Sequence, residues 1–316
     1  MLRRLEELDR LDAFARSPEE VLWPTGVSSR HDPRAWAPVP GGTDGPREPW
    51  FERRRGWAAV TAVAILVTVL FGSSRILQLL PARAERPVGA QIPSRSDEAS
   101  SERLLPVVVP AMGVPASSYA WMQTQSDGSD PVRFDPCRPL HYVTRSGTAG
   151  TAATTLVHEA VDAVSAASGM TFIHDGETAE APSKGRAPFQ PDRYGDRWAP
   201  ILIAWTDTTE SPELTADGAV GLGGGIPWRD TTGRVSYVSG TVWLDTAFAL
   251  PRLGDPEGRT AVRGVVIHEL MHVLGATHPA DPTQLMSVGG EGTTDLGVGD
   301  RYALAVLGAG DCVPGL

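Results

Sequence analysis

Residues 268–278 read His-Glu-Leu-Met-His-Val-Leu-Gly-Ala-Thr-His, and this stretch carries the strongest structural signal in the chain. His268 and His272 are four positions apart, so on a helix both imidazoles project from one face and can bind one ion. Gly275 follows three residues later, where a glycine can adopt a positive φ, end the helix and reverse the chain. The reversal allows His278 to approach the same ion from the other side.

This pattern of side chains is typical of a catalytic metal site. Three neutral imidazoles and a water molecule are a common ligand set for a zinc ion with one open position. Glu269 follows the first of these histidines and is not a ligand in this pattern, so it is the candidate general base for a metal-bound water. A chance match to all five positions is expected on the order of 10⁻⁵ times per chain. The alternative is a helix that merely carries buried histidines.

The sequence on either side of the motif predicts an α/β domain. Apolar residues at helical spacing predict three helices, which cover residues 151–168, 261–274 and 300–307. Short apolar or alternating runs predict four strands, at 140–144, 170–173, 201–205 and 241–245. Because strands that alternate with helices form mostly parallel sheets, we expect one domain with a mostly parallel sheet.

The extended motif resembles that of the metzincins, which are zinc endopeptidases with the pattern HExxHxxGxxH and a methionine-containing turn further along the chain. Asp-Pro-Thr-Gln-Leu-Met-Ser at 281–287 resembles that turn, and the resemblance assigns Met286 to it. Among the metzincins, the chain is most similar to the matrixins. Residues 241–245 (Thr-Val-Trp-Leu-Asp) resemble the edge strand that lines the matrixin cleft, and residues 294–303 resemble the start of the last matrixin helix.

The resemblance to bacterial matrixin-like proteases covers about residues 133–316 and is strongest over 241–308. It implies a metzincin-like zincin domain with a mixed, mostly parallel five-stranded sheet, an active-site helix and a C-terminal helix. It also implies zinc as the cofactor, the three histidines of the motif as its ligands, Glu269 as the general base, and a peptide or protein as the substrate. Two departures are Pro279, where matrixins usually have serine, and the absence of their cysteine-switch motif.

The acidic and glycine-rich residues before the motif have no fixed role in this resemblance. Counterparts of the histidines that bind the second zinc of animal matrixins are not evident in 176–240. Gly-Leu-Gly-Gly-Gly at 221–225 is not a phosphate-binding loop, because no Lys-Ser/Thr follows, and its glycines suit a bulge or a close backbone approach beside the cleft. Five aspartates could bind calcium or lie in a solvated loop: Asp175, Asp192, Asp196, Asp217 and Asp230.

The two cysteines of the chain, Cys137 and Cys312, lie on either side of the motif. In an oxidising compartment we expect them to form a disulfide, which would close a loop of roughly 175 residues. A latch between Cys137 and the zinc ion is the alternative.

The N-terminal part of the chain predicts a membrane anchor. Residues 57–71 are apolar and uncharged, and with the apolar run at 76–80 they predict one transmembrane helix over 56–80, long enough to cross a hydrocarbon core of roughly 30 Å. Three arginines at 53–55 precede it, so the positive-inside rule places residues 1–55 in the cytoplasm and the rest of the chain outside the cell. A cleaved signal peptide and a buried core helix are the alternatives.

The chain is therefore expected to have four parts. They are a largely disordered cytoplasmic segment (1–55), the transmembrane helix (56–80), a Pro/Ser-rich stalk (81–118) and a matrixin-like zinc peptidase domain (119–316). A net charge of −10 argues against general nucleic-acid binding, which needs a basic surface. The expected function is that of a membrane-anchored extracellular zinc endopeptidase. The alternative is a weak or inactive zinc-bound binding or adhesion module on a membrane stalk.

Overall fold

A computed structural model describes residues 92–93, 100, 102–128, 130–215, 219–287, 293–313 and 315–316. The chain divides into two compact units. All of the described residues belong to the same unit, the one that contains Ile92–Leu316. The predicted cytoplasmic segment and transmembrane helix lie outside the described residues. Within the residues that are described, no helix combines the length and the apolar character needed to cross a membrane.

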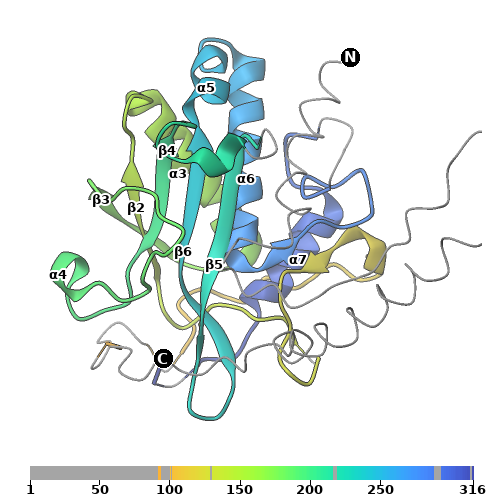
Figure 1. Cartoon of the computed structure of the whole chain (residues 1–316). Coiled ribbons are helices and arrows are strands. Elements are labelled where there is room, and N and C mark those ends of the chain that lie inside the picture. Colours follow the sequence, from red (N-terminus) through yellow and green to blue (C-terminus); the bar gives the residue numbers. More distant parts are fainter. Residues whose placement is uncertain are drawn as a thin grey trace, which may run out of the picture. The chain divides into compact units, whose positions relative to one another are not determined.

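A mixed five-stranded sheet forms one layer of the fold, with the strand order β3-β2-β4-β6-β5 (Figure 1). The strands are β2 (Leu140–Arg145), β3 (Phe172–Glu177), β4 (Ile201–Thr206), β5 (Gly221–Arg229) and β6 (Val235–Asp245). Strands β3, β2, β4 and β6 run parallel, whereas β5 pairs antiparallel with β6 at one edge. The predicted α/β class with a mostly parallel sheet is confirmed.

Two 19-residue helices, α3 (Gly150–Ser168) and α6 (Pro256–Leu274), cover one face of this sheet (Figure 1). They bury a continuous core against alternate residues of the central strands, and α7 (Val298–Gly308) packs on α3 and α6. Helix α6 begins where the Asp255 carboxylate accepts a hydrogen bond from the Gly258 amide at 2.8 Å. The predicted helix 261–274 therefore starts five residues earlier than expected.

The other face of the sheet is covered by loops and short elements. Small apolar clusters lie there, one of them formed by Leu214, Ala219, Leu222 and Trp243. The short elements of the described chain are η2 (Ala116–Ser118), β1 (Ala120–Trp121), α4 (Pro191–Tyr194), η3 (Pro212–Thr215), α5 (Thr246–Ala249), η4 (Leu250–Arg252) and β7 (Ala276–Thr277).

Two strand predictions need correction. The strand expected at 170–173 begins at Phe172 and continues to Glu177. The stretch 241–245 is the second half of β6, which lies between β4 and β5, so its resemblance to an edge strand was wrong. The edge strand next to β6 is β5, which the sequence did not reveal because glycine has a low strand propensity and leaves no side-chain alternation to read.

The chain on the N-terminal side of β1 also packs on this domain. The Arg103 guanidinium donates hydrogen bonds to the carbonyl oxygens of Gly308 (2.6 Å) and Gly310 (2.9 Å) at the end of α7. Strand β1 pairs antiparallel with β7. A part of the expected stalk, from about residue 102 onward, is thus built into the folded unit.

Cys137 and Cys312 form a disulfide, with their Cα atoms 5.3 Å apart. The expected bridge is present, and the alternative latch between Cys137 and a metal ion is wrong because the sulfur is bonded to Cys312. The bond ties the start of β2 to the residues after α7.

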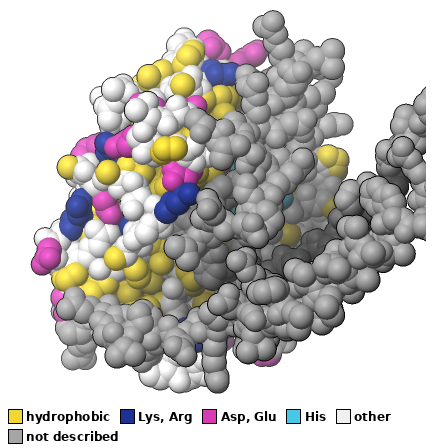
Figure 2. All heavy atoms as spheres, in the orientation of Figure 1, with side chains coloured by type: hydrophobic (Ala, Val, Ile, Leu, Met, Phe, Trp, Pro, Cys, Tyr) yellow, Lys and Arg dark blue, Asp and Glu magenta, His cyan; other side chains and the backbone are white. Residues whose placement is uncertain are grey.

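Charged side chains of both signs are scattered over the surface seen in Figure 2. On the described part of that face, the basic groups do not gather over one element. The candidate functional groups of the described chain are instead the three histidines at and just after the end of α6.

Candidate metal centre

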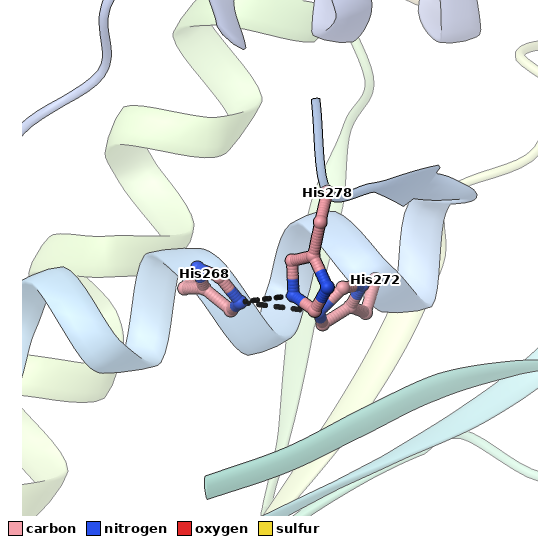
Figure 3. A group of neighbouring side chains, drawn as sticks. All are labelled: His268, His272 and His278. Carbon is pink, nitrogen blue, oxygen red and sulfur yellow. Dashed lines mark hydrogen bonds between the residues drawn. The ribbon is translucent and has the colours of Figure 1, made fainter. Parts of the chain in front are cut away.

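The end of α6 and the turn after it bring the three histidines of the motif together (Figure 3). His268 and His272 lie one turn apart on the helix. Gly275 ends it in the left-handed conformation (φ 113°), and its amide donates to the carbonyl oxygens of Met271 and His272. The chain then reverses through β7 and presents His278 to the other two rings. Gly275 is thus the residue at which the chain leaves the helix.

The Nε2 atoms of the three rings form a nearly equilateral triangle. The Nε2–Nε2 distances are 3.1 Å for His268–His272, 3.1 Å for His272–His278 and 3.2 Å for His268–His278. Zinc–nitrogen bonds of ~2.0–2.1 Å place the nitrogens of a tetrahedral site ~3.3–3.4 Å apart. The triangle therefore matches one face of a zinc coordination tetrahedron to within a few tenths of an ångström.

The hydrogen bonds behind the rings orient the lone pairs of two histidines toward the centre of this triangle. His268 Nδ1 lies 3.0 Å from the carbonyl oxygen of Leu285, and His272 Nδ1 lies 3.0 Å from that of Ala276. A carbonyl oxygen only accepts, so each Nδ1 carries the proton and each Nε2 presents a lone pair. Two lone pairs 3.1 Å apart repel each other, and a cation between them removes that repulsion.

Burial keeps the three imidazoles neutral at neutral pH. Burial, opposed by the Leu285 carbonyl, lowers the pKa of His268 to about 4. Burial and the neighbouring His268 lower the pKa of His278 to about 3, and the pKa of His272 is also far below its ordinary value. A neutral imidazole is the form that binds a metal ion, so the residues present fit zinc.

Glu269 follows His268 on α6, and its side chain is directed toward the edge strand β5. Its side chain is only 3% exposed, and a Cβ placed on Gly221 of β5 would be 2.8 Å from its Oε1 atom. Burial raises the pKa of Glu269 to about 8. A nearby cation stabilises the carboxylate, so an occupied metal site would favour the ionised form that a general base requires.

A row of glycines allows β5 to lie this close to α6. Gly221, Gly223 and Gly225 occupy alternate positions and face the helix, and a Cβ at Gly225 would be 2.5 Å from the carbonyl oxygen of Val273. The close backbone approach predicted for 221–225 is confirmed.

The predicted methionine turn lies beside the first histidine. Met286 is buried in the core, and the preceding Leu285 supplies the carbonyl oxygen that accepts from His268. Asp300, near the start of α7, holds this turn because its carboxylate accepts from the amides of Leu285 (2.7 Å), Gly297 (2.8 Å) and Met286 (3.3 Å). The sequence pattern predicts Asp300 at a helix start, but no local pattern indicates its contact with the turn.

Two of the aspartates considered for calcium have other partners, and a third, Asp192, lies in the first turn of α4. Asp175 pairs with Arg197 and His141, each at 2.6 Å. Asp230 accepts hydrogen bonds within its own turn, and Asp217 lies outside the described residues. Within the described chain, none of these aspartates belongs to a group of three potential ligands.

A second cluster, Asp135-Cys137-Cys312, has the spacing of a metal site. Its sulfurs are bonded to each other, however, and a disulfide sulfur does not offer the thiolate that metal binding needs. The histidine triad is therefore the candidate metal centre.

No protein-family model matches the chain, and no curated protein matches it. The residues of the site are therefore the basis for the proposed function.

Proposed function

We propose that this chain is a zinc endopeptidase, similar to the matrixins among the metzincins, and that the apolar segment 56–80, for which the sequence predicts a transmembrane helix, anchors it in the cell membrane with its catalytic domain outside. The observation that carries the proposal is the Nε2 triangle at the end of α6, with Glu269 buried beside it. Three neutral imidazoles, with a carboxylate that directly follows the first of them on α6, combine a metal site with a base.

In this proposal the three histidines bind the metal ion and Glu269 transfers the proton. His268, His272 and His278 would hold the zinc ion, which when bound polarises a peptide carbonyl and lowers the pKa of a water ligand. Glu269 takes the proton of the attacking water and delivers it to the nitrogen of the leaving amine. Its burial under Gly221 excludes bulk water, so the proton passes between the carboxylate and the reacting groups.

Strand β5 is the proposed docking edge for the substrate. It is the terminal strand of the sheet beside α6, and an extended peptide would add to it through main-chain hydrogen bonds. The cleft-lining role predicted for 241–245 is therefore assigned to β5, where a Cβ on Gly221 would overlap the Glu269 side chain.

The cysteine pair supports the extracellular location. Disulfides persist in oxidising compartments, and Cys137 and Cys312 are bonded to each other. The positive-inside rule at Arg53, Arg54 and Arg55 points to the same side of the membrane for the domain.

Peptide cleavage by the full-length chain tests the proposal. The wild-type protein in detergent is incubated with a diverse peptide library, with and without a chelator, and zinc content is measured in parallel. We expect one zinc ion per chain and cleavage that the chelator abolishes. A chain that binds zinc and cleaves no peptide would instead be a binding or adhesion module.

Replacement of the general base gives a sharper version of this test. The variant Glu269→Gln is expected to retain zinc and to lose activity on the order of 10²–10⁴-fold, because Gln cannot accept the water proton. Glu257→Gln is the matched control, since Glu257 is an exposed residue in the first turn of the same helix. If Glu269→Gln cleaved peptides at the wild-type rate, the assigned mechanism would be wrong.

A further inference from the structure

The segment 117–122 lies directly against the loop that carries the third histidine. In the β1–β7 pair, Ala120 is opposite Thr277 and Trp121 is opposite Ala276. The amide of Met122 donates to the carbonyl oxygen of Gly275 at 2.8 Å. The stretch between the helix end and His278 is thus held by backbone hydrogen bonding on one side.

The same segment also binds the chain after His278. The amide of Asp281 donates to the carbonyl oxygen of Ser117 at 3.0 Å. The Ser118 hydroxyl donates to the Asp281 carboxylate at 2.6 Å. His278 therefore lies between two points at which the segment 117–122 holds its loop.

A second metal-binding histidine depends on the same strand pair. The carbonyl oxygen that accepts from His272 Nδ1 belongs to Ala276, whose register partner is Trp121. The segment thus contacts both the loop that carries His278 and the residue whose carbonyl oxygen orients His272.

The segment is in turn fixed to α7. The rings of Tyr119 and Tyr302 have centroids 4.4 Å apart. The carbonyl oxygen of Ser118 lies so close to Gly299 that no side chain would fit there. Ser118 itself is buried, with 2% of its surface exposed. These contacts place the segment in one position relative to the metal centre.

We propose that residues 117–122 form a clasp that positions His272 and His278 for metal binding, and that the Ser118–Asp281 hydrogen bond is its closing contact. The inference rests on the proposed metal centre. If the loop that carries His278 were flexible, it would become ordered when the ion binds, and this ordering costs conformational entropy. The clasp removes that cost because the loop is already ordered by backbone and side-chain hydrogen bonds.

Metal affinity measured on the full-length chain tests the clasp. Zinc dissociation constants are obtained by competition with a chromogenic chelator, and the cobalt-substituted proteins are compared by absorption spectroscopy. Ser118→Ala is expected to weaken zinc binding about tenfold and to change the cobalt d–d bands, because the ligand geometry becomes less uniform. Asp281→Ala removes the same contact together with the hydrogen bonds that its carboxylate accepts from Thr283 and Gln284, so it is expected to weaken binding at least as much.

The matched control removes a serine hydroxyl hydrogen bond elsewhere in the domain. The Ser165 hydroxyl donates to the carbonyl oxygen of Met170 at 2.7 Å, near the end of α3. Ser165→Ala is expected to lower the melting temperature and to leave the zinc affinity and the cobalt spectrum unchanged. The double variant Ser118→Ala/Asp281→Ala is expected to bind zinc no more weakly than Asp281→Ala alone, since Asp281→Ala already removes the one contact with Asp281 that Ser118→Ala breaks.

The outcomes separate the clasp from the metal centre itself. Wild-type zinc affinity and an unchanged cobalt spectrum in both Ser118→Ala and Asp281→Ala would overturn the clasp and leave the proposed function standing. If the wild-type chain bound no zinc, the metal centre would be refuted, and the clasp with it.

Discussion

At the scale of single residues, Glu180 and Arg186 form a buried ion pair that no sequence pattern indicates. Two guanidinium nitrogens lie 2.9 and 3.0 Å from the two carboxylate oxygens. Arg186 also donates to the Ser239 hydroxyl and to the carbonyl oxygen of Pro200, both at 2.8 Å. The pair therefore attaches the loop after β3 to β6 and to the start of β4.

The lowered pKa of Glu180 predicts how the stability of the protein depends on pH. Burial by itself raises the pKa of Glu180, but hydrogen bonds from Arg186, Tyr194 and Gln190 outweigh it, so the pKa lies below its ordinary value. A carboxylate whose pKa is lowered by folding stabilises the protein above its unfolded pKa, and this contribution is lost as the pH falls through the folded pKa. We therefore expect part of the acid destabilisation below about pH 4.5 to come from Glu180.

Urea unfolding of Glu180→Gln between pH 7 and pH 3 measures this contribution. At pH 7 the variant is expected to lose about 3 kcal/mol of unfolding free energy, because it leaves the charge of Arg186 buried without its partner. Toward pH 3 its stability should approach that of the wild type. A stability difference that does not shrink with acid would contradict the assignment.

At the scale of elements, β5 and α6 pack closely beside the candidate metal centre. Strand β5 approaches the helix through glycines, and the backbone of Glu269 occupies the space that a Cβ of Gly223 would need. A glycine-rich strand has a weak intrinsic preference for its conformation, so pairing with β6 and packing on α6 must hold it in place.

Gly223→Ala tests that packing. The added methyl group would overlap the Glu269 backbone, so we expect a loss of about 1–3 kcal/mol of unfolding free energy. Because the overlap displaces Glu269, we also expect the peptidase activity of the folded variant to fall. Gly254→Ala is the control, since a Cβ there would meet no atom within 4 Å. Equal stabilities for the two variants in denaturant unfolding would show that the close approach is not required.

At the scale of the whole folded unit, contacts far apart in sequence join the two ends of the described chain. The Cys137–Cys312 disulfide spans a sequence separation of 175 residues. The amide of Ser100 donates to the carbonyl oxygen of Cys137 at 3.0 Å, and Arg103 binds the end of α7. Both ends of the described chain are thus attached close to one another.

Loss of the disulfide is expected to cost about 2–5 kcal/mol of unfolding free energy, because a loop this long restricts the unfolded chain strongly. The measurement is guanidinium unfolding of the wild type with and without reductant, compared with Cys137→Ser/Cys312→Ser. The reduced wild type and the double variant should unfold at the same midpoint, below that of the oxidised protein. An unchanged midpoint after reduction would contradict the expectation.

The parts of the fold that could be predicted from the sequence are those with a local pattern. The helical spacing of apolar residues predicted α3, α6 and α7, and most of the parallel strands appeared as short apolar runs. Strand β5 was missed because its first five residues are Gly-Leu-Gly-Gly-Gly, which have no pattern of buried and exposed side chains. The contact of Asp300 with the turn at Met286 was missed because it joins two segments that are apart in the sequence.

The sequence by itself determined the donor set and the approximate direction of the histidines, because two of them are one helical turn apart and a glycine permits the reversal that brings the third. The tertiary structure alone decided which strand lies beside Glu269, which carbonyl oxygens hold the protons of His268 and His272, and which segment holds the loop of His278. The physical reason is that the sequence pattern records the periodicity of one element, whereas these contacts arise only when separate elements pack together.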